Sequence, residues 1–212
     1  MMNKKHRKNS QRWLREHGSD VYVKQANLAG YRSRAVYKLA QIDSRDHLFR
    51  PNMTVIDLGA APGGWSQWVT QRLHNQVRLF ALDILPIEPL PGVSFIQGDF
   101  REQMVLDELL NQLGEHKADL VMSDMAPNIS GVKAIDQPRA ILLAELARDL
   151  ALEVLTAQGY FLTKIFQGEG FDAYIKELRA YFKQVMIRKP EASRSRSSEV
   201  YVLAKEKKSP PN

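Results

Sequence analysis

The sequence contains no cysteine among its 212 residues. Disulfides, thiolate zinc sites, iron–sulfur clusters and cysteine nucleophiles are therefore excluded. Histidine is also sparse, because the five histidines stand singly at positions 6, 17, 47, 74 and 116, without the spacing of metal ligands. We therefore expect no structural metal.

Long hydrophobic runs are missing as well. No apolar stretch approaches the roughly 20 residues that cross a bilayer, and the basic start of the chain lacks the apolar segment of a signal peptide. These absences predict a cytoplasmic protein with no membrane partner. The nucleotide-binding patterns Gly-x-x-x-x-Gly-Lys-Ser/Thr and Gly-x-Gly-x-x-Gly do not occur either, so a nicotinamide-dependent dehydrogenase is a remote alternative.

Positive charge is concentrated at the start of the chain, although the formal net charge is only +6. Residues 1–19 are predicted to form a flexible basic arm. Such an arm suits a polyanion such as nucleic acid, whereas a merely solubilising tail would explain the same composition. Six lysines and arginines precede the first acidic residue: Lys4, Lys5, Arg7, Lys8, Arg12 and Arg15.

The stretch 55–65, Val-Ile-Asp-Leu-Gly-Ala-Ala-Pro-Gly-Gly-Trp, reads as a buried strand followed by a glycine-rich turn and a helix. Gly59, Gly63 and Gly64 allow positive φ and a close approach of the backbone to a ligand. Free amides at the helix start favour negative or electron-rich groups. The helix that follows has one apolar face, made of Trp65, Trp68, Val69 and Leu73.

Strands and helices are predicted to alternate along residues 20–205, which we expect to form one α/β domain, with a frayed tail at 206–212. This alternation predicts a parallel sheet with crossover helices. Strands six and seven, at 184–188 and 200–204, are predicted to form an antiparallel hairpin at one edge of the sheet. A long helix is predicted to start near 136, with Leu142, Leu146, Leu150 and Val154 on one face.

Charged residues recur where the predicted strands end. Ligands of open α/β sheets collect beyond the carboxyl ends of the strands, and Asp83, Asp99, Asp124 and Lys164 all fall there. Asp83 stands where an acid would accept hydrogen bonds from ribose hydroxyls, and Asp99 could accept one from an adenine amino group. Ordinary turn or helix-cap roles remain the alternative for both residues.

Taken together, these motifs resemble those of the FtsJ family of RNA 2′-O-ribose methyltransferases over nearly the whole chain. The pattern Asp57-x-Gly59-x-x-Pro62-Gly63-Gly64 resembles the first motif of S-adenosylmethionine-dependent methyltransferases. Departures from the family pattern lie in the basic arm and in the loop at 85–93. The other matching stretches are Ser33-Arg-Ala-Val-Tyr-Lys38-Leu, Ser123-Asp-Met-Ala-Pro, Lys164-Ile-Phe-Gln-Gly-Glu-Gly170, Arg188-Lys-Pro and Ser198-Glu-Val-Tyr.

The resemblance implies a Rossmann-like methyltransferase fold, with a seven-stranded, mostly parallel sheet, one antiparallel edge strand and helices on both faces. It implies S-adenosylmethionine as cosubstrate, no metal, and a uridine 2′-hydroxyl in 23S rRNA of the large ribosomal subunit as acceptor, with the protein acting as a monomer. The implied cofactor-binding residues are Gly63 and Trp65 for the methionine part, Asp83 for the ribose, Asp99 for the adenine, and Asp124. The implied catalytic tetrad is Lys38, Asp124, Lys164 and Glu199.

Methyl transfer to a hydroxyl needs the acceptor oxygen in line with the methyl group and a group that removes the proton. We assign the proton acceptor to Lys164. A free lysine, with a pKa of about 10.4, is a poor base at neutral pH, so this role requires partial burial or a second lysine nearby. Glu199 would orient an amine or the 2′-hydroxyl. Two ordinary surface salt bridges are the alternative for the tetrad.

Two other functions stay open at this point. The first is a 2′-O-methyltransferase of the same family that acts on tRNA or on a cap. The second is a non-catalytic RNA-binding or assembly factor that retains the fold. The complete tetrad argues against the second alternative.

Overall fold

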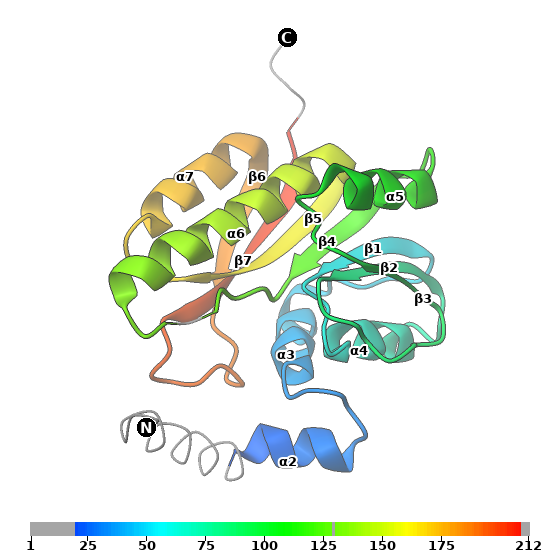
Figure 1. Ribbon diagram of the computed structural model, residues 1–212, viewed down its shortest axis with the longest axis horizontal. Helices are drawn as coiled ribbons and strands as arrows, with labels where there is room; N and C mark the ends of the chain where they lie inside the picture. The colour runs from blue at the N-terminus through cyan, green and yellow to red at the C-terminus, as the bar shows by residue number, and fades with distance from the viewer. Residues whose placement is uncertain (1–19, 129, 209–212) are drawn as a thin grey trace, which may run out of the picture.

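The computed structural model of the protein describes residues 20–128 and 130–208. The predicted basic arm at 1–19 lies outside the described residues, and so does the end of the predicted tail, at 209–212. All the strands within the described part of the chain form one seven-stranded sheet (Figure 1). Its strands are β1 (Met53–Leu58), β2 (Val77–Asp83), β3 (Val93–Gln97), β4 (Ala118–Ser123), β5 (Leu155–Phe166), β6 (Phe182–Arg188) and β7 (Glu199–Lys207).

The strand order is β3-β2-β1-β4-β5-β7-β6. Strands β1 to β5 pair in parallel, while β7 pairs antiparallel with both β5 and β6. The predicted hairpin at the sheet edge is therefore present. The antiparallel strand, β7, is not the edge strand itself, because β6 pairs with its outer side and forms the edge of the sheet. β7 continues to Lys207, two residues into the predicted C-terminal tail, where the lysine donates hydrogen bonds to the carbonyls of Leu152 and Leu155.

Helices cover both faces of the sheet (Figure 1). One face packs against α5 (Gln103–Leu113), α6 (Lys133–Val154) and α7 (Phe171–Tyr181), and the other against α3 (Val36–Asp46) and α4 (Gly64–Arg72). A further short helix, α2 (Val21–Leu28), precedes α3. This arrangement confirms the predicted mostly parallel sheet with helices on both faces.

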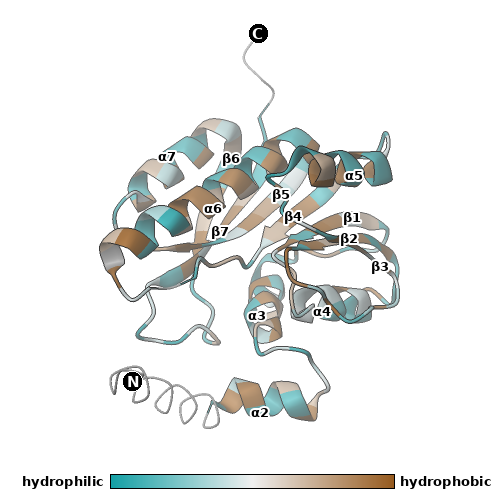
Figure 2. Cartoon of the chain, in the orientation of Figure 1, coloured by the Kyte–Doolittle hydropathy of each residue, from teal (hydrophilic) through white to brown (hydrophobic). Residues whose placement is uncertain are grey.

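The face that α6 buries coincides only in part with the face shared by Leu142, Leu146, Leu150 and Val154, of which Leu150 and Val154 are buried. Leu142 is 49% exposed, and Leu146 is only partly buried. The hydropathy of the helix is accordingly mixed along its length (Figure 2). Small side chains let α6 lie close to the sheet, and an alanine stripe carries less hydropathy signal than leucines do. The buried positions are Ala140, Ala144, Ala147, Leu150, Ala151 and Val154.

The order of the strands reverses beside β1. From β1 the chain first adds β2 and β3 on one side, and then β4 and β5 on the other. In open α/β sheets a ligand crevice forms at such a switch point, beyond the carboxyl ends of the strands. Asp57, Asp83, Asp124 and Lys164 lie at or near these ends. Residues that are distant in the sequence thus meet where the parallel strands have their carboxyl ends.

Candidate active site

The glycine turn after β1 has the backbone that its sequence predicts. Gly59 has a φ of +73° and Gly63, the N-cap of α4, a φ of +98°, values that side chains with a Cβ rarely adopt. The amide of Gly59 donates to the Leu82 carbonyl at 2.9 Å. A Cβ built on Gly59 would lie 2.3 Å from Cγ of Met125. The turn therefore packs tightly against the segment that follows β4.

A cleft of about 350 Å³, here called the strand-end cleft, opens beside this turn. The Asp83 carboxylate on its wall accepts hydrogen bonds from the amides of Ala61 and Leu85, both at 2.8 Å. A carboxylate offers about four lone-pair sites, so Asp83 retains acceptor capacity toward the cleft. The lining combines three carboxylates with apolar side chains: Asp83, Asp99, Asp124, Leu82, Ile84, Leu85, Phe100, Met125, Ala126 and Leu143 among them.

Asp99 also lines the strand-end cleft, but it has a partner that the sequence did not reveal. The Arg101 guanidinium donates to both Asp99 oxygens, at 2.9 Å from Nε to each. These hydrogen bonds lower the pKa of Asp99 below its usual value, against the opposing effect of burial. Its contact with an adenine amino group stays a prediction, since part of its acceptor capacity serves the arginine.

Trp65 lies in the hydrophobic core rather than on the wall of the strand-end cleft. Its side chain is only 3% exposed, its Nε1 donates to the Ala35 carbonyl at 2.8 Å, and its ring contacts that of Tyr201 with centroids 5.8 Å apart. Gly63 lies beside Arg32 and Leu90. The predicted contact of these two residues with the methionine part of the cofactor therefore stays a prediction.

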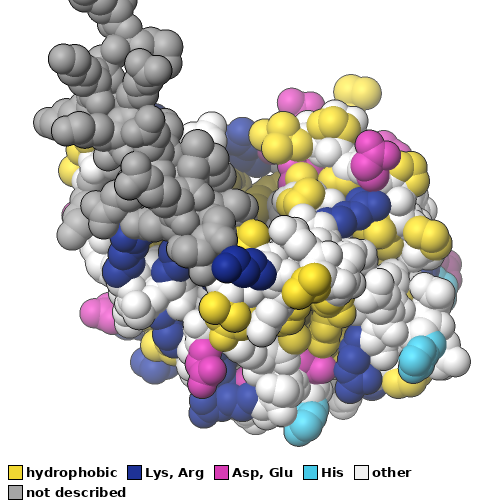
Figure 3. Space-filling view, turned by 90° about the horizontal axis from the view of Figure 1, so that it is seen from below, with side chains coloured by type: hydrophobic (Ala, Val, Ile, Leu, Met, Phe, Trp, Pro, Cys, Tyr) yellow, Lys and Arg dark blue, Asp and Glu magenta, His cyan; other side chains and the backbone are white. Residues whose placement is uncertain are grey.

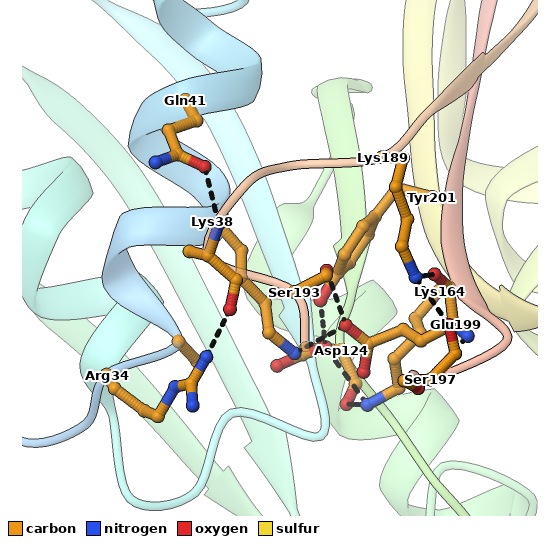
Figure 4. A network of polar contacts seen from close by, with 12 residues as sticks. Arg34, Lys38, Gln41, Asp124, Lys164, Lys189, Ser193, Ser197, Glu199 and Tyr201 are labelled. Atoms are coloured by element: carbon orange, nitrogen blue, oxygen red, sulfur yellow. Dashed lines mark hydrogen bonds and ion pairs between the residues drawn. The ribbon is translucent and has the colours of Figure 1, made fainter. Parts of the chain in front are cut away.

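A second cleft of about 300 Å³ is lined by three residues of the predicted tetrad, Lys38, Lys164 and Glu199, and the fourth, Asp124, pairs with Lys164 from the wall of the strand-end cleft (Figure 4). Lys164 Nζ lies 3.0 Å from Asp124 Oδ1 and also donates to the Asp124 carbonyl. Lys38 Nζ lies 2.8 Å from Glu199 Oε1. We call this the lysine cleft; Ala126 lines both clefts. The lysine cleft is lined by Arg34, Ala35, Lys38, Ala126, Lys164, Phe166, Arg194, Ser197 and Glu199.

Tyr201 also holds Asp124, at the same carboxylate oxygen that pairs with Lys164. Its hydroxyl donates to Asp124 Oδ1 at 2.6 Å. Burial alone would raise the pKa of Asp124, but the charges of Lys164 and Lys38 and the Tyr201 hydrogen bond outweigh it, so the pKa is lowered. Burial and the same carboxylate raise the pKa of Tyr201 well above its usual value. Asp124 is thus an ionised acceptor that orients the Lys164 amine.

The loop between β6 and β7 supports Glu199 and α3 through contacts that sequence reasoning missed (Figure 4). Ser193 Oγ donates to Glu199 Oε1 at 2.8 Å, and Gln41 Oε1 accepts from the Ala192 amide at 2.9 Å. Lys189 Nζ donates to the carbonyls of Ser197 and Glu199. In the sequence this loop appears only as a serine- and arginine-rich linker. No local pattern signals that it folds back onto α3.

Asp57 is buried beneath the glycine turn. It is 1% exposed, and its Oδ2 accepts a hydrogen bond from Ser66 Oγ at 2.7 Å. Burial raises its pKa to about 7, against the Ser66 hydrogen bond, and the nearby charges of Asp124 and Asp83 raise it further. Asp57 is therefore largely protonated below neutral pH, which the sequence motif alone did not indicate.

On the molecular face seen from below, lysine and arginine side chains are interspersed with acidic, histidine and hydrophobic side chains (Figure 3). Within residues 20–128 and 130–208, no group of three or more histidine or acidic side chains is placed to hold a metal ion. None of the helices in that same part of the chain is both long and apolar enough to cross a membrane.

Comparisons with known proteins agree with the motifs. Residues 31–207 match the FtsJ-like methyltransferase family. A ribosomal RNA large subunit methyltransferase E from Legionella pneumophila (strain Paris) is 58% identical over 198 residues, which cover 93% of this chain and 96% of that protein.

Solved structures show the same fold. A ribosomal RNA methyltransferase from Plasmodium falciparum aligns with a TM-score of 0.76 at 28% identity, over 84% of this chain and 98% of that one. Human methyltransferase-like protein 13, solved in complex with SAH, aligns with a TM-score of 0.54 at 14% identity, over 81% of this chain and 79% of that one. The second likeness concerns the fold alone. Because the family match spans most of the residues and the four motif residues form two neighbouring ion pairs, the chain belongs to the FtsJ-like methyltransferase family.

Proposed function

We propose that the protein transfers the methyl group of S-adenosylmethionine to the ribose 2′-hydroxyl of a uridine in 23S rRNA of the large ribosomal subunit. The observation that carries the proposal is the tetrad itself. Two lysine–carboxylate pairs, with separations of 3.0 and 2.8 Å, lie where the lysine cleft adjoins the strand-end cleft: Lys38, Lys164 and Glu199 line the former, Asp124 lines the latter, and Ala126 lines both. The ribosomal RNA substrate is inferred from the name of the Legionella relative.

The lining of the strand-end cleft fits S-adenosylmethionine. Its apolar walls suit a flat adenine ring, and its carboxylates can accept hydrogen bonds from the hydroxyl and amino groups of the cofactor. We assign the ribose to Asp83, the adenine to Asp99, and the methionine part to Gly63 and Trp65, with Asp124 at the border of the two clefts. When bound, the cofactor supplies an electrophilic methyl group on a sulfonium.

The residues of the lysine cleft then have separate tasks. Lys38, held by Glu199, positions the acceptor ribose. Asp124 holds the Lys164 amine toward the border of the clefts. Lys164, as the free amine, accepts the proton of the 2′-hydroxyl on its Nζ, so that the oxygen can form its bond to the methyl group. Holding the oxygen in line with the methyl group and removing its proton both lower the barrier to transfer.

We also propose that the protein acts as a monomer in the cytoplasm. Both clefts are formed by residues of one chain, and a ribosomal RNA substrate is located in that compartment. The predicted arm at 1–19 would add affinity for RNA phosphates.

The test uses cells that lack this protein. Large ribosomal subunits and tRNA from these cells are incubated separately with the purified protein and methyl-labelled S-adenosylmethionine, and the 2′-O-methyl groups are mapped. We expect one new methyl group, on a uridine of 23S rRNA. Label in tRNA would instead identify a tRNA methyltransferase of the same family. Absence of label in both RNA classes would favour a non-catalytic assembly factor.

A further inference from the structure

The face of the β5–β7 pair that looks toward α3 presents four side chains in two adjacent cross-strand pairs. In the antiparallel register, Lys164 is the partner of Tyr201, and Phe166 is the partner of Glu199. Residues two apart in a strand project to the same face, and opposed side chains on one face lie within contact distance. Three of these four residues already belong to the polar site described above. Phe166 is the fourth, and no step of the proposed mechanism uses it.

Phe166 differs from the other phenylalanine of its strand. Phe161 is fully buried, with its ring stacked against that of Phe182 at 6.3 Å between centroids. Phe166 is only partly buried and lines the lysine cleft. Among the described residues it makes no ring contact with another aromatic side chain. An aromatic ring is therefore present on the wall of a cleft whose other side chains are mainly charged.

Phe166 lies two residues after Lys164 on β5 and lines the same cleft. Two residues along a strand are separated by roughly 6.6 Å, a distance of the same order as the size of a nucleoside. A ribose held at Lys164 therefore brings its own base within reach of Phe166. Proteins that recognise unpaired RNA commonly stack splayed bases on aromatic side chains.

We propose that Phe166 is the platform on which the base of the acceptor nucleotide stacks while its 2′-hydroxyl lies at Lys164. This inference rests on the proposed function. A phenyl ring carries no hydrogen-bonding group, so the platform holds the nucleotide without selecting one base. Arg194 and Ser197 line the same cleft and supply the polar groups that can meet the edge of the base.

Two substitutions separate stacking from simple packing. Phe166→Leu keeps an apolar side chain but removes the aromatic face, whereas Phe166→Tyr keeps the ring. Base–aromatic stacking contributes about 1–3 kcal/mol per base, which corresponds to a change of about 5- to 150-fold. Tyr181→Leu is the matched control, because Tyr181 is an aromatic residue that is 46% exposed on α7 and lines neither cleft.

The measurements are kcat/KM on large ribosomal subunits from cells lacking the protein, the Kd for S-adenosylmethionine, and the melting temperature. We expect Phe166→Leu to lower kcat/KM by about 5- to 150-fold, with the cofactor Kd and the melting temperature unchanged. Phe166→Tyr and Tyr181→Leu should stay close to the wild-type protein.

Several results would overturn the inference while leaving the proposed function intact. These are full activity of Phe166→Leu, a loss in Phe166→Tyr as large as in Phe166→Leu, or a loss that is accompanied by an equal loss of cofactor affinity or of fold. A wild-type protein that methylates no ribosomal substrate would overturn the proposed function, and this inference with it.

Discussion

Asp57 makes the stability of the protein depend on pH in a direction unusual for a carboxyl group. The raised pKa means that the folded protein holds a proton which the unfolded chain releases at lower pH. Such a group stabilises the fold most below its unfolded pKa of 3.8, and that contribution is lost as the pH rises toward the folded pKa of about 7. The informative perturbation is Asp57→Asn, which removes the titration but keeps an oxygen that can accept from Ser66.

The size of this change in unfolding free energy follows from the folded and unfolded pKa values of Asp57 and from the burial of its side chain, which is 1% exposed. Each unit of pKa difference corresponds to about 1.4 kcal/mol. The full pKa shift of roughly three units therefore lowers the unfolding free energy by about 4 kcal/mol once Asp57 is ionised in both the folded and the unfolded protein. Between pH 5 and pH 8 the wild-type protein should lose about 2.5 kcal/mol of unfolding free energy relative to Asp57→Asn.

The assay is urea unfolding followed by circular dichroism at pH 5, 6, 7 and 8. The quantity compared is the difference in unfolding free energy between the two proteins, because carboxyl groups that do not interact with Asp57 contribute equally to both curves. Ser66→Ala provides a second check: since the Ser66 hydrogen bond lowers the Asp57 pKa, its removal should extend the loss of stability to higher pH. Parallel curves for the wild-type protein and Asp57→Asn would refute the reasoning.

Three further predictions concern the cofactor, the arm and the proton acceptor. Asp83→Ala should weaken S-adenosylmethionine binding about tenfold or more, because a hydrogen bond to a charged group contributes roughly 1.5–3 kcal/mol; an unchanged Kd in calorimetry would remove Asp83 from the site. Deleting residues 1–8 removes four lysines and arginines. In a plot of log RNA affinity against log salt concentration, the slope should become shallower by roughly 0.7 for each phosphate contact that is lost. Equal slopes for the two proteins would indicate a solubilising tail. Lys164→Ala and Lys164→Arg should both abolish methyl transfer with cofactor binding largely intact, since an arginine does not deprotonate in practice. Near-native single-turnover rates in the arginine variant would show that Lys164 positions the hydroxyl and does not accept its proton.

Local signals were sufficient for much of the fold. The strand-length apolar runs at residues 77–83 and 93–97, which the sequence predicts as strands, coincide with β2 and β3. The glycine turn was equally predictable, because Gly59 and Gly63 adopt backbone conformations that other residues avoid. Hydropathy does not indicate which face of α6 is buried, because the buried stripe is mostly alanine and its burial depends on how closely the helix approaches the sheet.

The sequence alone determined which chemical groups the site contains. Lys38, Asp124, Lys164 and Glu199 were identified from motif contexts that are separated by up to 161 residues, and the structure brings them into two ion pairs. Only the tertiary structure decided their surroundings. Four features depend on strand order and register. They are the burial of Asp57, the hydrogen bond from the Tyr201 hydroxyl to Asp124, the packing of the β6–β7 loop onto α3, and the position of Phe166 opposite Glu199. Burial and register are properties of packed elements, so no local stretch of the chain encodes them.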